Sequence, residues 1–205
     1  MSRKLVQLAR EQVDEAAKVL ARAFRDNPGV RAVLVRQPSE VRQQMFERAS
    51  RTFVDVARRY GLASGVQEGE HIRGVSLAYA PGGYPLPVRA QLSLARAALA
   101  GGPRIAFRFA QVDAYMRGAH LRRPHYYLFM IGVDPSEQGK GHGGVLLRRL
   151  NELADSERVE CYLETDRQEN VALYERFGYR VTSEDNLKRL DNLLLWTMTR
   201  PSRAG

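Results

Sequence analysis

Four glycines lie within the seven residues between positions 138 and 144, directly before an amphipathic helical pattern. Glycine lets backbone N–H groups approach a ligand closely and adopt positive φ. The first turn of a helix adds free N–H groups and a dipole that favours an anion. The segment therefore predicts a site for a pyrophosphate group. The residues of this predicted site are Gln138, Gly139, Lys140, Gly141, His142, Gly143 and Gly144.

Two other phosphate motifs can be weighed against this segment. A Walker A loop is excluded, because Lys140 is followed by glycine and not by serine or threonine. The dinucleotide fingerprint G-x-G-x-x-G is matched literally by Gly139, Gly141 and Gly144. In that fold, however, the first glycine lies against the end of the strand. Here residues 134–138 intervene and too little chain follows for a second half-sheet, so hydride transfer is the weaker interpretation.

The segments around the glycines predict an α/β fold with a mixed sheet. Segment 126–133 is apolar throughout, which is typical of a strand buried on both faces and marks the centre of the sheet. Apolar spacing predicts helices over residues 11–24, 39–60, 88–99, 104–119, 141–155 and 170–177. It predicts the other strands over residues 62–67, 72–80, 159–164, 179–183 and 193–199.

Composition limits the class of protein. The 205 residues, 44% hydrophobic and 27% charged, fit one domain spanning 1–205. No apolar run reaches the ~18 residues of a membrane span, and the N-terminus lacks the apolar core of a signal peptide, so we expect a cytoplasmic protein. The single Cys161 excludes an intrachain disulfide, and His120 and His125 lack partners at metal-ligand spacing. We therefore expect no metal.

The formal net charge of +9 comes from 28 arginines and 4 lysines spread along the whole chain. Such a balance suits nucleic acid, a membrane surface or an anionic small molecule, and it also arises from codon bias alone. No basic stripe interleaved with aromatic residues stands out, so nucleic acid and membrane are unfavoured as partners.

Two motifs together resemble those of the GNAT superfamily of N-acetyltransferases. Gln138, Gly141 and Gly143 meet a Gln/Arg-x-x-Gly-x-Gly/Ala pattern after a Val-Asp-Pro turn. Segment 170–179 follows in order and resembles the family's Asn-containing helix and Phe-Gly-Tyr turn. The resemblance covers residues 126–182 as the cofactor-binding and catalytic core. It implies a mixed, centrally splayed sheet flanked by helices, with a helical insert at 85–120 between the third and fourth strands.

The resemblance also implies acetyl-CoA as co-substrate and assigns roles. The backbone of Ile131, Gly132 and Val133 would pair with the pantetheine arm, and Gly132 would mark the bulge that splays the sheet. The N–H groups of residues 139–144 would hold the pyrophosphate, and Gln138 would brace the turn. Asn170 would hydrogen-bond the pantetheine region. Tyr174 would lie near the thioester sulfur and protonate the departing thiolate; the alternative for it is a packing tyrosine.

The general base is the least constrained assignment. Glu164 ends the strand beside the cofactor strand, at the sheet edge where α/β sites usually lie. It would accept the amine proton directly or through water; the alternative is a carboxylate bonded to nearby backbone N–H groups. Asp113, Tyr115 and His125 are further candidates.

The implied activity is transfer of acetyl to a primary amine by direct attack on the thioester. We expect a small-molecule acceptor, shaped by segment 81–119 and by residues 24–30. The Leu-Glu-Thr of residues 163–165 and the long insert resemble the puromycin N-acetyltransferase-like branch. A protein or peptide acceptor, a CoA-binding regulatory module without turnover and a basic nucleic-acid binder remain alternatives, and a homodimer is left open.

Overall fold

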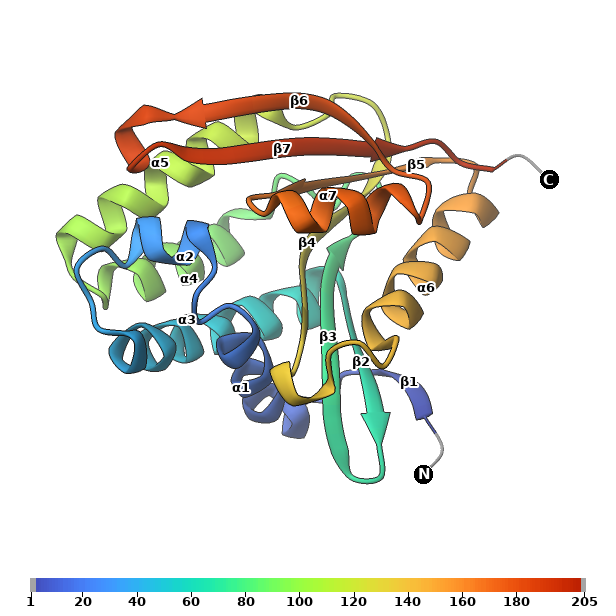
Figure 1. Cartoon of the computed structure of the whole chain (residues 1–205), viewed down its shortest axis with the longest axis horizontal. Coiled ribbons are helices and arrows are strands. Elements are labelled where there is room, and N and C mark those ends of the chain that lie inside the picture. The colour runs from blue at the N-terminus through green and yellow to red at the C-terminus, as the bar shows by residue number, and fades with distance from the viewer. Residues whose placement is uncertain (1–2, 204–205) are drawn as a thin grey trace.

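The computed structural model describes residues 3–203, which contain one seven-stranded sheet in the order β1-β2-β3-β4-β5-β7-β6 (Figure 1). The strands are β1 (Arg3–Gln7), β2 (Leu62–Glu68), β3 (His71–Tyr79), β4 (His125–Val133), β5 (Glu160–Thr165), β6 (Arg180–Leu187) and β7 (Leu193–Arg200). The helices are α1 (Val13–Ala23), α2 (Pro28–Val33), α3 (Ser39–Tyr60), α4 (Val88–Leu99), α5 (Pro103–Ala119), α6 (His142–Ser156) and α7 (Gln168–Glu175).

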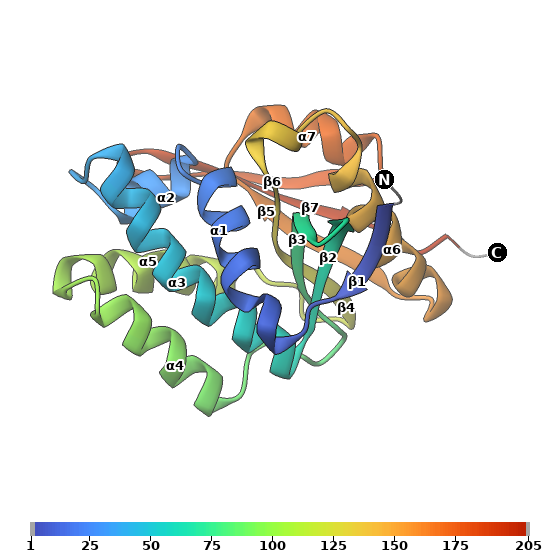
Figure 2. The same cartoon turned by 90° about the horizontal axis from the view of Figure 1, so that it is seen from below.

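Helices cover both faces of the sheet, with α1–α5 gathered on one side and α6 and α7 on the other (Figure 2). The periodicity of the sequence explains this, because α1 buries Ala16, Ala17 and Leu20 while α6 buries Leu146 and Leu147. α1 and α6 each turn one apolar stripe to the sheet and leave charged residues in water. Among residues 3–203, no helix combines the length and the apolar character that a membrane crossing requires.

The sheet separates at its centre. β4 and β5 are parallel, and they pair only from His125 with Glu160 to Leu128 with Leu163. Beyond that point β4 continues to Val133 beside β3, while β5 continues to Thr165 beside β7. Within the described residues, the β5-facing edge of β4 therefore has no strand partner after Leu128. This confirms the mixed, centrally splayed sheet, with segment 126–133 at its centre.

The prediction that Gly132 marks the bulge is wrong. Leu77 pairs with Met130 and Ala78 with Leu128, so the extra residue of β4 is Phe129. Gly132 pairs regularly with Val75. A Cβ at Gly132 would meet side-chain atoms of Leu20, Ala23 and Phe24 at 3.0–3.2 Å. The glycine is needed there because α1 packs directly against the strand.

The helical insert lies where it was expected, with α4 and α5 between the third and fourth strands. The Tyr115 hydroxyl donates to Asp185 Oδ2 at 2.7 Å, and Arg108 pairs with Asp191 at 2.6 Å. These contacts fix α5 to β6 and to the turn before β7. The structure also contains β1 and α2, which the sequence reasoning did not predict.

Candidate active site

The glycine segment forms a tight loop that opens α6. Gly139 and Gly141 have φ of +79° and +85°, which other residues adopt only with strain. The Gln138 side chain donates from Nε2 to the Val133 carbonyl at 3.3 Å, and Arg3 donates to the Lys140 carbonyl at 2.9 Å. The loop is therefore held by its own first residue and by β1, and the first turn of α6 begins immediately after it.

The side chain of His142 points into the protein. It is fully buried, and neither ring nitrogen has a hydrogen-bond partner among residues 3–203. Its Nε2 lies 3.6 Å from Glu137 and 4.0 Å from Glu68, a grouping of ligand types that can hold a metal ion. Both carboxylates are already paired, Glu137 with Lys140 at 2.7 Å and Glu68 with Arg3 at 3.4 Å. Because its side chain points inward, His142 can contact a ligand at the loop only through its main-chain atoms.

The two motifs of the sequence are in contact with each other. A Cβ at Gly144 would lie 3.1 Å from the ring of Phe177, so the turn after α7 packs directly against the first turn of α6, where the glycine leaves room for the ring. Asn151 of α6 donates to the Phe177 carbonyl at 3.4 Å and accepts from the Tyr179 hydroxyl at 3.1 Å. The loop and the Phe-Gly-Tyr turn therefore form one packed unit.

Asn170 and Tyr174 lie on α7 and line a pocket that opens beside the splayed strands. Asn170 donates to Thr165 Oγ1 at 3.3 Å, which holds its side chain at the end of β5. Tyr174 is buried, and this burial raises the pKa of its phenol above the usual value; the charge of Asp166 adds to the shift. The phenol is therefore protonated at neutral pH and is able to donate.

Glu164 lines the same pocket from β5. Its Oε1 is buried and has no hydrogen-bond partner in the part of the chain that the structure describes. Burial raises the pKa of the carboxyl to about 7, and the Tyr127 and Tyr162 hydroxyls offset part of this shift. A carboxylate that exchanges a proton near neutral pH is suited to general base catalysis.

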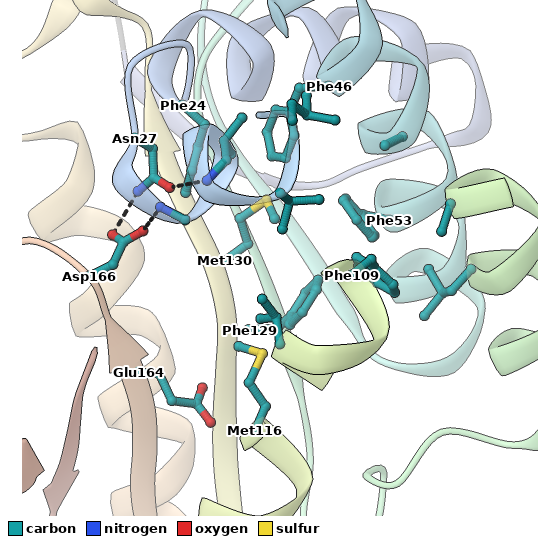
Figure 3. Close-up of a pocket in the computed structure, with 18 of the residues that line it drawn as sticks. Phe24, Asn27, Phe46, Phe53, Phe109, Met116, Phe129, Met130, Glu164 and Asp166 are labelled. Atoms are coloured by element: carbon teal, nitrogen blue, oxygen red, sulfur yellow. Dashed lines mark hydrogen bonds between the residues drawn. The ribbon is translucent and has the colours of Figure 1, made fainter. Parts of the chain in front are cut away.

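The pocket has a volume of about 400 Å³ and lies between the splayed strands and the helices α1–α5 (Figure 3). Phe129 and Met130, the adjacent residues at the bulge, both line it, as does Ile131. Segment 24–30 and the insert contribute to its wall as expected, with Phe24 and Phe109 among the lining residues.

Asp166 completes the wall and was missed by the sequence reasoning. Its carboxylate accepts from Asn27 Nδ2 at 2.7 Å and from the Gly29 N–H at 2.6 Å, so it ties the start of α2 to the end of β5 (Figure 3). Burial raises the pKa of Asp166, and these two bonds offset part of the shift. In the sequence, the only indication that Asp166 belongs to the site is that it is acidic and lies two positions after Glu164.

The other candidate bases are already engaged. Asp113 pairs with Arg117 at 2.6 Å, and the Tyr115 hydroxyl donates to Asp185. His125 has its Nδ1 2.7 Å from the Arg123 carbonyl and its Nε2 3.0 Å from His120. Of the groups considered, Glu164 lines the pocket and has one carboxylate oxygen without a hydrogen-bond partner among residues 3–203.

Comparison with known proteins supports this architecture. The model of the acetyltransferase (GNAT) family matches residues 99–179. The N-alpha-acetyltransferase RimI of Mycobacterium tuberculosis is 37% identical over 78 residues, which are 38% of this chain and 49% of that protein. The mycothiol acetyltransferase of Mycobacteroides abscessus is 40% identical over 70 residues, 32% of this chain and 24% of that protein. The chain thus spans between about a fifth and a half of the length of the curated relatives it matches.

Solved structures resemble the whole chain in fold. The polyamine N-acetyltransferase of Drosophila melanogaster has a TM-score of 0.72 at 14% identity, covering 98% of this chain and 100% of that one. An N-acetyltransferase of Thermoplasma acidophilum solved with coenzyme A has a TM-score of 0.60 at 12% identity, covering 98% and 99%. Residues 99–179 therefore resemble the acetyltransferase (GNAT) family in sequence, and the chain as a whole shares its fold with solved acetyltransferases.

Proposed function

We propose that the protein is an acetyl-CoA-dependent N-acetyltransferase whose acceptor is a primary amine of a small molecule. One observation carries the proposal. The unpaired edge of β4 and the Glu164 carboxyl, with a pKa of about 7, border the same pocket. A thioester lying along that edge would place its carbonyl within reach of an amine held in the pocket.

The chain offers a fitting cradle for the co-substrate. Residues 139–144 present backbone N–H groups around a loop with two positive-φ glycines at the start of α6, which suits a pyrophosphate. The open edge of β4 at Ile131, Gly132 and Val133 would pair with the pantetheine arm as an added strand does. Asn170, held by Thr165, would hydrogen-bond the same arm.

Glu164 and Tyr174 would share the proton transfers. Glu164 takes a proton from the acceptor amine, because a carboxyl with a pKa near 7 is largely ionised at slightly alkaline pH yet still basic enough to be useful. The neutral amine forms a bond to the thioester carbonyl carbon, its nitrogen loses that proton to Glu164 as the tetrahedral intermediate forms, and the carbon–sulfur bond then breaks. Tyr174 donates its phenolic proton to the departing thiolate, whose conjugate thiol has a pKa of about 8.5.

A small-molecule acceptor is favoured over a peptide by the shape of the wall. The insert closes over the pocket with Leu94, Ile105, Phe109 and Met116, so the space is a pocket and not an open groove along strands. A peptide would need partners for its backbone groups, and few polar side chains line this wall.

Calorimetry and thiol release test the proposal together. Acetyl-CoA should bind the purified protein, and free thiol should appear only when an accepted amine is added. Tyr174→Phe should lower kcat by at least 10-fold with little change in acetyl-CoA affinity, whereas Tyr60→Phe, at an exposed tyrosine on α3, should change neither. Binding without turnover across a broad amine library would support a regulatory module instead. Absence of binding at millimolar acetyl-CoA would overturn the proposal.

A further inference from the structure

The polar groups of the pocket wall are few, and most of them already have partners. Asn27 accepts from the Val30 N–H at 3.0 Å and donates to Asp166, and Thr165 accepts from Asn170. A ligand with many hydroxyl or amide groups would therefore lose hydrogen bonds to water without replacing them.

The charges of the wall are fewer still. Among the described lining residues the acids are Glu164 and Asp166, and the single cation is Arg48, which is exposed. Asp166 is occupied by Asn27 and Gly29. One carboxyl is therefore left to face an amine, and no second anion is available for a second ammonium group.

The remainder of the wall is aromatic and aliphatic. Phe46 and Phe53 lie across the pocket from Glu164, and Phe53 stacks on Phe109 with ring centroids 6.4 Å apart (Figure 3). Phe129 meets Phe53 edge to face at 5.6 Å. Burial of an apolar body against such a wall is favourable, whereas an unpaired charge placed there is destabilising.

We infer that the acceptor is a monoamine whose amino group is attached to an apolar aryl or alkyl body, and not a polyamine, an aminoglycoside or a peptide. This inference rests on the proposed function. The amino group lies at Glu164, and the body fills the space between α3, α5 and β4 that Phe46, Phe53 and Phe109 enclose.

Two amines of equal size test the inference. Hexylamine and 1,5-diaminopentane have the same number of non-hydrogen atoms and differ in having a methyl or an ammonium group at the far end. With saturating acetyl-CoA, kcat/KM for hexylamine should exceed that for 1,5-diaminopentane by at least 100-fold, because the second ammonium has no partner. 2-Phenylethylamine should be acetylated at least as well as hexylamine, and spermidine and kanamycin no better than the diamine.

A variant of the wall gives an independent readout. Met45, on α3, lines the pocket and is half-buried. Met45→Glu keeps the length of the side chain and adds a carboxylate that can pair with the second ammonium group. The ratio of kcat/KM for hexylamine to kcat/KM for 1,5-diaminopentane should therefore fall at least 10-fold. Met45→Gln, which is polar but neutral, should leave the ratio within about 3-fold. Both variants should bind acetyl-CoA as the unmodified protein does, and their melting temperatures report whether folding is intact.

The outcomes separate this inference from the proposed function. Turnover of spermidine, kanamycin or a peptide N-terminus with higher kcat/KM than of hexylamine would overturn the inference and leave the acetyltransferase intact. The inference is likewise overturned if octanoyl-CoA replaces acetyl-CoA with equal kcat/KM, since the apolar space would then hold the acyl chain. Failure to bind acetyl-CoA, with no thiol release from any amine, would remove both.

Discussion

The proposed donor half of the site, formed by residues 126–182, and the proposed acceptor wall, formed by helices α1–α5, differ in what they offer a ligand. The donor half presents main chain, with the open edge of β4 and the loop at Gly139 and Gly141. The acceptor wall presents apolar side chains such as Phe46 and Phe53. Main-chain recognition requires glycines at fixed places and therefore leaves a pattern in the sequence. Recognition by apolar side chains uses the same residue types as any core and leaves none.

The largest expected effect lies where the two regions meet. Glu164→Gln removes the proposed general base, and kcat/KM should fall by about 10²–10⁴-fold. The unmodified protein should show a limb in its pH–kcat/KM profile that rises through about pH 7, because the carboxyl acts when ionised. That limb should be absent in the variant, and the acetyl-CoA dissociation constant should be unchanged. A profile that keeps the limb in Glu164→Gln would assign the base to another residue.

Gly132→Val tests whether helix α1 packs directly against strand β4, the strand whose free edge is proposed to bind acetyl-CoA. The new side chain would collide with Leu20, Ala23 and Phe24, because even its Cβ would lie 3.0–3.2 Å from them. We expect a loss of about 1–3 kcal/mol in the free energy of unfolding, measured by urea denaturation. The matched control is Gly118→Ala on α5, where a Cβ meets nothing within 4 Å. Equal stability of the two variants would show that α1 is not packed on β4 as described.

The buried carboxyl also predicts a pH-dependent stability. The pKa of Glu164 is about 7 in the folded protein and about 4.3 in an unfolded chain, so the unfolded state releases this proton first. Its contribution to stability is therefore lost as pH rises between about 4 and 8. Glu164→Gln should be more stable than the unmodified protein at pH 8, by about 1–3 kcal/mol. At pH 4.5 the two should unfold alike, and a gain that did not vary with pH would contradict the assignment.

The smallest effect is expected at the loop of the donor half. Gly141 has φ of +85°, and a Cβ there would meet Arg3 only at 3.7 Å, so the cost of Gly141→Ala is backbone strain and not collision. Strain of about 1–2 kcal/mol should weaken acetyl-CoA binding about 5- to 30-fold by calorimetry. The amine preference of the acceptor wall should not change. A changed preference would mean that the two regions are not independent.

The donor half is also the part of the fold that the sequence predicted best. The apolar segment 126–133, the helix after the glycines and the strand ending near Glu164 all form where the pattern placed them. The splay of the sheet followed from the resemblance of the two motifs and is confirmed. The roles of Glu164 and Tyr174 stay predictions that the experiments above address.

Three features of the structure could not be predicted from the sequence, each for a physical reason. β1 is an edge strand with mostly exposed side chains, so no apolar alternation marks it. Asn27 caps α2 by accepting from the Val30 N–H and Pro28 follows it, but Asn followed by Pro is as typical of a turn as of a helix start, so α2 has no distinctive pattern. Asp166 acts through contacts with segment 27–29, and no local pattern reports a partner so far away in the chain.

The extra residue in β4 has a consequence for related sequences. Tyr127 belongs to the core cluster that contains residues of α1 and α3, and a Cβ at Gly132 would meet α1. Both positions therefore lie on the same face of the sheet, although an odd number of positions separates them. In a regular strand two residues on one face are always an even number of positions apart. In a relative whose β4 has no bulge, the glycine would therefore have to lie an even number of positions from the tyrosine to remain on the same face. The parity of the tyrosine-to-glycine spacing is therefore a way to detect this bulge in relatives known only by sequence.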